Sequence, residues 1–301
     1  MPAPAGRAEP TNRPSLGVVF RPQLPPERLR SVALAADAAG LDALWLWEDC
    51  FYEAGVSAAA AALAWTSRLR VGVGLLPVPL RNVALTAMEV ATLARLFPGR
   101  VEVGIGHGVQ DWMAQVGEQV DSPMTLLREY ATALRALLAG QRVTAHGRYV
   151  HLEDVALEWP PAEMPPLVIG AVGPRTVALS GELADGTLLT GGTSPETLRA
   201  VCAQLDAARA AAGVQGSHGV TVYLIAATGG DAAHRLDAEL RSWALDPAQE
   251  VAIAGDAEQL AEGVRRWTAA GADAVVLQPT QDEPDLEGFI DVIGREVLPL
   301  V

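Results

Sequence analysis

Three short segments of this sequence combine glycine with residues that can bind anions or move protons. The first, GAVGPR (Gly170–Arg175), follows an apolar run and precedes a stretch with helical periodicity. At a helix start the backbone N–H groups are free and the helix dipole favours negative charge, and glycine lets a phosphate approach the backbone. Pro174 suits the first helical position, where its missing donor costs nothing. The segment therefore fits an anion site, although a tight Gly-Pro connection is the alternative.

The second segment is Glu48-Asp49-Cys50, which ends another apolar run. Two adjacent carboxylates could orient a ring N–H or act as acid and base, and a capped, solvated loop is the alternative. Cys50 has no support in the surrounding sequence as a nucleophile. Glu48 and Asp49 are therefore the candidates for catalysis in this segment.

The third segment is VGIGHG, in which Gly104, Gly106 and Gly108 have no side chains to cover the backbone. A flat ring could lie against this backbone, and close packing inside the fold is the alternative. His107 could donate to a ring carbonyl or shuttle a proton. The segment is not a dinucleotide-binding GxGxxG motif, because Val109 stands where the third glycine is required.

The composition excludes several classes of function. All 22 basic residues are arginine, which excludes a Schiff-base lysine and the lysine of a P-loop. A net charge of -14 opposes binding to nucleic acid. Two cysteines are too few for a disulfide framework, His146 and His151 lack matching carboxylates for a metal site, and there is no GxSxG motif.

The hydropathy of the chain and the composition of its first residues predict where in the cell the protein is found. No run of about 20 apolar residues is present that would enter a membrane. The first 14 residues are rich in proline and lack the order of a signal peptide. We therefore predict a cytoplasmic protein with a disordered leader over residues 1–14.

The three segments form one site if the surrounding elements place them together. Apolar, β-branched runs alternate with longer stretches of helical periodicity, which indicates βα units around a parallel sheet. Strands are predicted at Ser15–Phe20, Ala43–Trp47, Arg70–Leu76, Val101–Gly106, Leu167–Val172, Gly186–Gly191, Val220–Ala227 and Ala272–Gln278. Helices are predicted at Pro26–Ala39, Gly55–Trp65, Asn82–Phe97, Pro123–Ala139, Pro174–Leu183, Pro195–Ala212, Ala257–Ala270 and Leu286–Val297.

Eight strands, each followed by a helix, predict an α/β fold: a single (β/α)8 TIM barrel over residues 15–301. In such a barrel all strand ends meet at one face, and this would bring the three segments together. Two stretches are longer than the connections that a minimal βα unit needs. Residues 141–166 predict a hairpin-like insertion after the fourth strand, and residues 229–255 form a second insertion after the seventh.

The order of several motifs carries a resemblance that covers nearly the whole chain from Ser15. The motifs are LDALWLWED, RVGVGLLPVPLRN, FPGRVEVGIGHG, GAVGPRTVALSGELADG and AGADAVVLQP. In this combination the sequence resembles the luciferase-like monooxygenase family, and within it the branch of reductases and dehydrogenases that use the deazaflavin coenzyme F420. The resemblance implies a flavin or deazaflavin ring at the barrel mouth.

The same resemblance implies roles for individual residues. The backbone after the fifth strand would hold the cofactor phosphate, and a non-proline cis peptide between Gly74 and Leu75 would back the ring. Asp49 would fix the ring edge, and His107 is the remaining proton donor. The implied cofactor-binding residues are Asp49, Gly74, Leu75, Gly106, His107, Gly108, Ala171, Val172, Gly173, Pro174 and Arg175.

Two departures from the family pattern bear on the substrate. Many relatives have Asp-His after the second strand, whereas this chain has Asp49-Cys50. Sugar-phosphate dehydrogenases of the branch have a glutamate where Val109 stands, so a sugar phosphate is not the expected substrate. Cys50, Val109 and Trp112 are instead predicted to line a more apolar substrate pocket.

The leading hypothesis is an oxidoreductase that uses coenzyme F420, or alternatively reduced FMN, for hydride transfer to a small organic substrate or for its monooxygenation. A barrel that has lost catalysis and only binds a flavin or another ligand is one alternative. A phosphate-binding isomerase without flavin is another. Neither nucleic acid nor membrane is predicted as a partner, and the resemblance suggests a homodimer.

Overall fold

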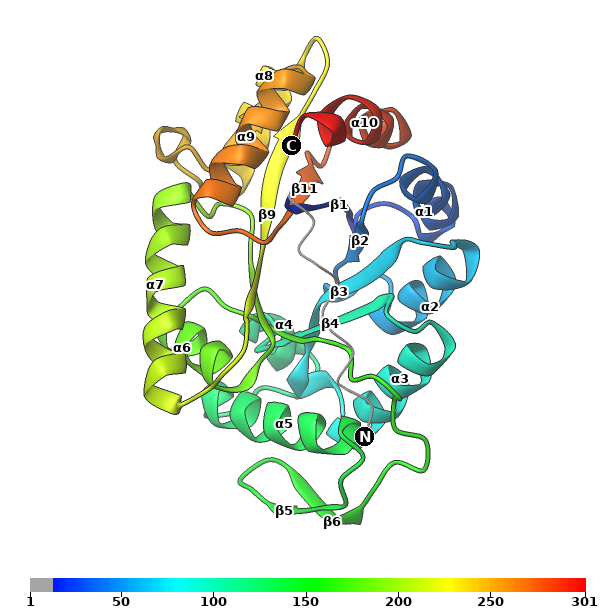
Figure 1. Cartoon of the computed structure of the whole chain (residues 1–301), viewed down its shortest axis with the longest axis vertical. Helices are drawn as coiled ribbons and strands as arrows, with labels where there is room; N and C mark the ends of the chain where they lie inside the picture. The colour runs from blue at the N-terminus through cyan, green and yellow to red at the C-terminus, as the bar shows by residue number, and fades with distance from the viewer. Residues whose placement is uncertain (1–12) are drawn as a thin grey trace.

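Eight parallel strands close into a barrel in the computed structural model, which describes residues 13–301 (Figure 1). Their order is β1-β2-β3-β4-β7-β8-β9-β11, and β11 pairs with β1 to close the ring. The barrel strands are β1 (Ser15–Phe20), β2 (Ala43–Leu46), β3 (Arg70–Pro77), β4 (Val101–Gly106), β7 (Leu167–Gly170), β8 (Gly186–Leu189), β9 (Gly219–Ala227) and β11 (Ala274–Pro279). The predicted (β/α)8 TIM barrel is confirmed.

Eight helices follow the eight strands and cover the outside of the barrel (Figure 1). They are α1 (Leu29–Ala38), α2 (Gly55–Trp65), α3 (Val83–Leu96), α5 (Pro123–Leu138), α6 (Pro174–Leu183), α7 (Pro195–Ala212), α9 (Ala257–Ala269) and α10 (Leu286–Val292), which continues as a π-helical turn (Ile293–Val297). Four of them begin at side-chain caps, namely Asn82 at α3, Ser194 at α7, Asp256 at α9 and Asp285 at α10. The Ser194 hydroxyl accepts from the Thr197 N–H, and Asp256 forms a capping box with Gln259.

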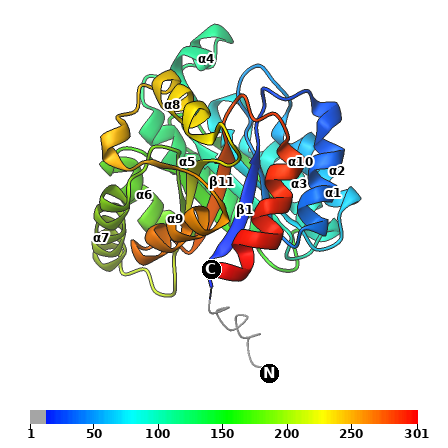
Figure 2. The same cartoon turned by 90° about the horizontal axis from the view of Figure 1, so that it is seen from above.

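Five further α-helices and strands lie outside the minimal pattern. The first insertion contains the predicted hairpin, formed by the antiparallel strands β5 (Val143–His146) and β6 (His151–Val155). The second contains α8 (Ala232–Ser242) and β10 (Ala252–Ala254), neither of which we predicted. The short helix α4 (Gln110–Gln115) was also missed, because six residues are too few to show a helical period. Figure 2 shows α4 and α8 at the end of the barrel where its strands end.

The interior of the barrel is filled by its own strands. Six strands contribute to a buried cluster of side chains, which contains Val19, Ala43, Trp45, Trp47, Val168, Leu188, Tyr223 and Val276. A larger cluster packs the outer face of the sheet against the helices. The interior is therefore a packed core that ends at the carboxyl ends of the strands, where a site can form.

The predicted leader covers residues 1–14, and its residues 1–12 lie outside the described part of the chain. Arg13 is described and forms an ion pair with Asp42 at 2.7 Å.

Gly72 makes room for the largest buried ring of the interior. A Cβ at this position would lie 2.5 Å from the indole of Trp45, which is 1 % exposed. We expect Gly72→Ala to lower the free energy of unfolding by about 1–3 kcal/mol, because the ring cannot move aside in a packed core. Urea denaturation measures this change. Gly219→Ala is the control, since its Cβ would meet no atom within 4 Å, and equal losses in both variants would contradict the prediction.

Candidate active site

A cavity of ≈ 440 Å³ lies at the carboxyl ends of the barrel strands. It receives residues from the loops after β2, β4, β7 and β8, from β3 and β9 themselves, and from the end of α8. Its lining consists of Trp47, Glu48, Asp49, Gly74, Leu75, Pro77, His107, Gly108, Val109, Trp112, Gly170, Ala171, Val172, Gly173, Thr176, Leu188, Thr190, Gly191, Tyr223 and Trp243. Mostly apolar walls with a few converging polar groups are typical of sites for small organic ligands.

The three segments singled out in the sequence do meet at this cavity. The predicted site residues that line it are Glu48, Asp49, Gly74, Leu75, His107, Gly108, Val109, Trp112, Ala171, Val172 and Gly173. Four others lie outside the lining, namely Cys50, Gly106, Pro174 and Arg175. Cys50 is half-buried behind the lining, and Pro174 and Arg175 are exposed in the first turn of α6.

Gly106 does not offer its backbone to a ligand, because a leucine covers it. A Cβ at Gly106 would lie 2.5 Å from the Leu75 side chain, and one at Gly170 would lie 2.3 Å from it. The two glycines thus make room for Leu75, which lines the cavity above them. The peptide bond between Gly74 and Leu75 is cis, as the family resemblance implied, and the Cys50–Phe51 bond is also cis.

The turn after β7 presents free backbone donors. The Ala171 N–H belongs to the sheet, since it donates to the Leu188 carbonyl at 3.1 Å. The N–H groups of Val172 and Gly173 donate to no other group among residues 13–301. The Gly173 carbonyl turns into α6 and accepts from the Thr176 and Val177 N–H groups. Two amides at a helix start therefore remain for an anion.

The two adjacent acids after β2 have different surroundings. Both carboxylate oxygens of Glu48 are bound by Arg81, at 2.6 and 3.1 Å, and one also accepts from the Gly55 N–H at 2.7 Å. Glu48 thus fixes the start of α2 and has no free oxygen for acid–base work. Burial raises the pKa of Asp49, while the positive charge of Arg21 opposes this effect. Asp49 is the carboxylate that can face a ligand.

His107 is held as a neutral imidazole at the cavity. Burial is the largest cause that lowers its pKa below 6.5, and the positive charge of Arg175 acts in the same direction. Nε2 lies 3.1 Å from the Thr176 hydroxyl. Nδ1 is buried and has no hydrogen-bond partner among the described residues, and the backbone of Pro123 raises the pKa, against the effect of burial. Nε2 and the Thr176 hydroxyl, which also lines the cavity, are therefore the pair through which this imidazole can accept or return a proton.

Nine residues of the lining were not among the predicted site residues: Trp47, Pro77, Gly170, Thr176, Leu188, Thr190, Gly191, Tyr223 and Trp243. Trp47 directly precedes the acid pair, and Thr176 lies one turn into α6, so position along the chain could have indicated both. Burial raises the pKa of Tyr223 well above its ordinary value of 10.0, and its hydroxyl donates to the Gly74 carbonyl at 3.3 Å. Tyr223 and Trp243 had no sequence signal, because they reach the cavity from β9 and α8.

Acidification is expected to destabilise the fold through His107 and His218. Burial is the first cause that lowers the pKa of each below 6.5, so the folded protein binds fewer protons than the unfolded chain. This stability is present above the unfolded pKa and is lost as the pH falls through the folded pKa, at up to about 1.4 kcal/mol per pH unit for each group.

His218 allows a test away from the cavity, because its Nε2 bonds to the Thr187 hydroxyl at 2.8 Å outside the lining. His218→Gln should show a smaller loss of stability than the wild type between neutral pH and about two units lower, measured by urea denaturation at each pH. Parallel curves for the two proteins would show that His218 does not cause the loss.

The described residues contain no group of three or more His, Cys, Asp or Glu side chains that could bind a metal ion. Within the same residues, none of the helices is long and apolar enough to cross a membrane.

The comparison with known families gives a match over most of the chain. A family model described as luciferase-like monooxygenase matches residues 8–279. The chain belongs to this family. Among curated members, a 5,10-methylenetetrahydromethanopterin reductase of Methanolobus tindarius is 28% identical over 200 residues, which are 66% of this chain and 60% of that protein. The chain thus spans less than two thirds of that relative's length.

Two further luciferase-like relatives match over more of their length. An F420-dependent glucose-6-phosphate dehydrogenase of Kineococcus radiotolerans is 28% identical over 298 residues, with 89% of this chain and 85% of that protein covered. A solved structure of an F420-dependent secondary alcohol dehydrogenase, in complex with an F420-acetone adduct, has a TM-score of 0.85 at 22% identity, with 96% and 99% covered. At that identity the structure supports the shared barrel of the family.

Proposed function

We propose that this chain is a luciferase-like oxidoreductase that binds coenzyme F420 at the barrel mouth and exchanges a hydride with a small organic substrate. The observation that carries the proposal is the turn after β7, whose two unpaired amides, Val172 and Gly173, border the cavity that also holds Asp49 and His107. A phosphorylated cofactor fits this arrangement, because its anion would meet free donors and its ring would meet an apolar cavity.

Each part of the site would have its own role in binding the cofactor. Val172 and Gly173 would bind the phosphate, Leu75 would pack behind the ring, and Asp49 would face the ring edge. When bound, the deazaflavin supplies the hydride chemistry, and the protein supplies binding and orientation. In alcohol oxidation His107 would take up the proton of the substrate hydroxyl, and in carbonyl reduction it would return that proton to the carbonyl oxygen. The accompanying exchange of a hydride with the substrate carbon is the chemistry that the cofactor would supply.

The curated F420-dependent glucose-6-phosphate dehydrogenase described above supports the choice of F420 over FMN in this proposal. The test is an equilibrium titration of the purified protein with F420 and, separately, with FMN, followed by fluorescence. We expect micromolar binding of F420 and weaker binding of FMN. Tight binding of FMN alone, with oxygen uptake by the reduced complex, would favour a monooxygenase. Binding of neither would leave the flavin-independent isomerase.

A barrel that binds F420 without catalysis is the remaining alternative. Glu48 is unable to act as acid or base, and the family's histidine after Asp49 is replaced by Cys50, so His107 alone would carry the proton. Single-turnover oxidation of reduced F420 by a substrate carbonyl distinguishes the two. Absence of turnover with every carbonyl that binds would favour the silent barrel.

A homodimer stays a prediction. On α3, Leu85 and Met88 are exposed apolar side chains, and α2 beside it contains no charged residue. Two chains of net charge -14 can approach closely only through an uncharged face of this kind. Light scattering of the purified protein should give twice the mass of one chain, and Met88→Asp should reduce it to one.

A further inference from the structure

One side of the cavity is built from three neighbouring rings, Trp47, Tyr223 and Trp243, here called the aromatic wall. The centroid of Trp47 lies 5.7 Å from that of Tyr223 and 6.3 Å from that of Trp243. All three rings line the cavity. Rings at these separations attract one another and offer a broad apolar surface.

The indole donor of Trp47 is buried within the aromatic wall. Trp47 is 7 % exposed, and its indole N–H is buried without a hydrogen-bond partner among the described residues. It approaches the Tyr223 hydroxyl but falls short of hydrogen-bond geometry. Because this nitrogen is buried beside Tyr223, Trp47 offers a bound molecule its apolar ring surface and no free donor.

The charges around the cavity disfavour an anionic substrate. Among the residues that line it, none is an arginine, and the chain has no lysine. Two carboxylates, Glu48 and Asp49, belong to the lining, and burial keeps His107 neutral. A phosphate or carboxylate placed here would have no cation to pair with, and burying an unpaired charge is costly. The free amides of the β7 turn are already assigned to the cofactor.

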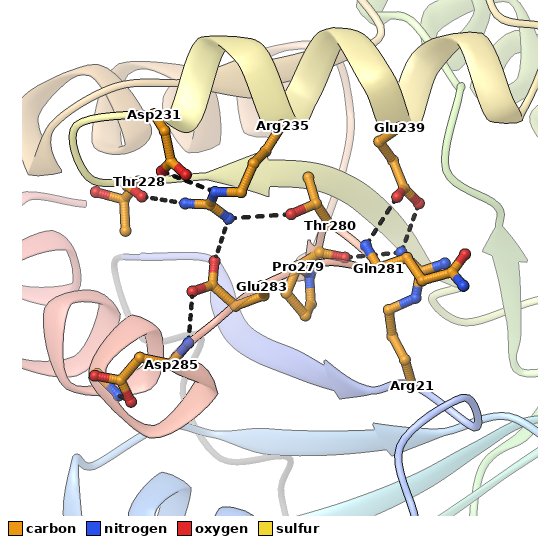
Figure 3. A network of polar contacts seen from close by, with 11 residues as sticks. Arg21, Thr228, Asp231, Arg235, Glu239, Pro279, Thr280, Gln281, Glu283 and Asp285 are labelled. Carbon is orange, nitrogen blue, oxygen red and sulfur yellow. Dashed lines mark hydrogen bonds and ion pairs between the residues drawn. The ribbon is translucent and has the colours of Figure 1, made fainter.

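A buried ion pair holds the aromatic wall from behind. The guanidinium of Arg21 lies 5.7 Å from the centroid of Trp47. Its Nη1 donates to Glu239 at 2.5 Å and to the Pro279 carbonyl at 3.0 Å (Figure 3). The side chains of Arg21 and Glu239 are only 4% and 3% exposed. A cation against an indole face, itself bound to a buried carboxylate, fixes the orientation of that ring.

The same ion pair also holds the helix end that carries the third ring. Glu239 lies on α8, one turn before Trp243, and the Trp243 backbone N–H donates to the Glu239 backbone carbonyl at 3.1 Å as part of the helix. Its second carboxylate oxygen accepts from the Gln281 N–H at 2.8 Å. Glu239 thus joins α8 to the ends of β1 and β11, and this determines where Trp243 meets Trp47.

A second anchor holds the other end of α8 (Figure 3). Arg235 donates to Glu283 at 2.6 Å, to the Thr280 hydroxyl at 3.1 Å and to the Thr228 carbonyl at 2.5 Å. This anchor does not involve Glu239. Loss of the Arg21–Glu239 pair should therefore shift the end of α8 that carries Trp243 and leave the helix attached.

We propose that the substrate is a small, uncharged carbonyl compound or the corresponding alcohol, bound against the aromatic wall, and that the Arg21–Glu239 pair positions this wall. The proposal rests on the oxidoreductase function proposed above. The wall supplies apolar contact, and the cavity lining offers no cationic partner for an anion. Glu239 is a positioning residue, since it acts through Trp47 and Trp243.

The test compares neutral with anionic ligands of similar shape, with and without F420. The probes are cyclohexanone, cyclohexanol and cyclohexanecarboxylate, and binding is measured by calorimetry and by quenching of tryptophan fluorescence. We expect the two neutral probes to bind at least about tenfold more tightly than the carboxylate. Equal or tighter binding of the carboxylate, or no binding of the neutral probes to the F420-loaded protein, would overturn the proposal. Failure of F420 itself to bind would instead overturn the proposed function.

Two variants test the wall and its support. Trp243→Ala should weaken cyclohexanone binding by about tenfold, and Trp243→Phe should restore most of it. Glu239→Gln should raise the KM for the neutral substrate by about tenfold, with a smaller change in kcat and unchanged F420 affinity. Glu262→Gln, on the exposed face of α9, is the matched control. Unchanged cyclohexanone binding in both Trp243→Ala and folded Glu239→Gln would overturn the role of the wall.

Discussion

Replacing His107 by glutamine is expected to lower kcat by ~10²–10⁴-fold, the usual contribution of a positioned proton-transfer group. The physical reason is the state of the ring: burial keeps it neutral, Thr176 holds Nε2 at 3.1 Å, and Nδ1 is unpaired. Glutamine can still bond to Thr176 but cannot take up a proton. The measurement is the steady-state rate of oxidation of a neutral alcohol such as cyclohexanol, in which His107 acts as the base, followed by the absorbance of F420 as it is reduced.

The pH profile separates a proton-transfer role from a structural one. Because the pKa of His107 is lowered, the acid limb of kcat/KM in the wild type should lie below pH 6.5, and it should be absent in His107→Gln. His146→Gln is the matched control, since His146 is exposed on the β5–β6 hairpin. A His107→Gln enzyme with a wild-type rate and the same acid limb would assign the proton transfer to another group.

Replacing Gly173 by proline is expected to weaken F420 binding by about tenfold to a hundredfold. A hydrogen bond to a charged group contributes about 1.5–3 kcal/mol, and proline removes one donor from the phosphate. The change requires a modest shift of the backbone, because φ of Gly173 is -91° and proline prefers about -65°, and a Cβ there would meet no atom within 4 Å. Fluorescence titration with F420 measures the loss.

Gly173→Ala is the control for this prediction, since alanine keeps the N–H and fits the same open space. Its F420 affinity should remain close to that of the wild type. Equal affinities for the proline and alanine variants would show that the phosphate is bound elsewhere. A loss in both would point to the shape of the turn, and the Gly173 N–H would then not be the decisive donor.

Much of the fold could be predicted because buried parallel strands have a plain sequence signature. A strand covered on both faces is a continuous apolar run, and β1 and β4 begin and end at the predicted residues. Other strands were predicted to extend too far. The run after β7 continues through Ala171 and Val172, but the chain leaves the sheet at Gly170 and turns into α6. Hydropathy does not show where pairing stops.

Parts of the site could also be predicted, since a parallel barrel brings all strand ends to one face. That rule placed Asp49, His107 and the turn at Gly173 around one cavity without knowledge of any contact. It could not show what each side chain does there. Glu48 and Asp49 are neighbours in the chain, yet Glu48 is bound by Arg81, 33 residues away, and Asp49 is not.

The sequence by itself thus determined the barrel, the face that carries the site and the segments that reach it, because these follow from local periodicity and from strand direction. Only the tertiary structure decided which side chains meet across the cavity. Leu75 covers Gly106, and the Arg21–Glu239 pair joins residues 218 positions apart. Contacts of this kind depend on the distance between elements in space, and no short stretch of sequence encodes that distance.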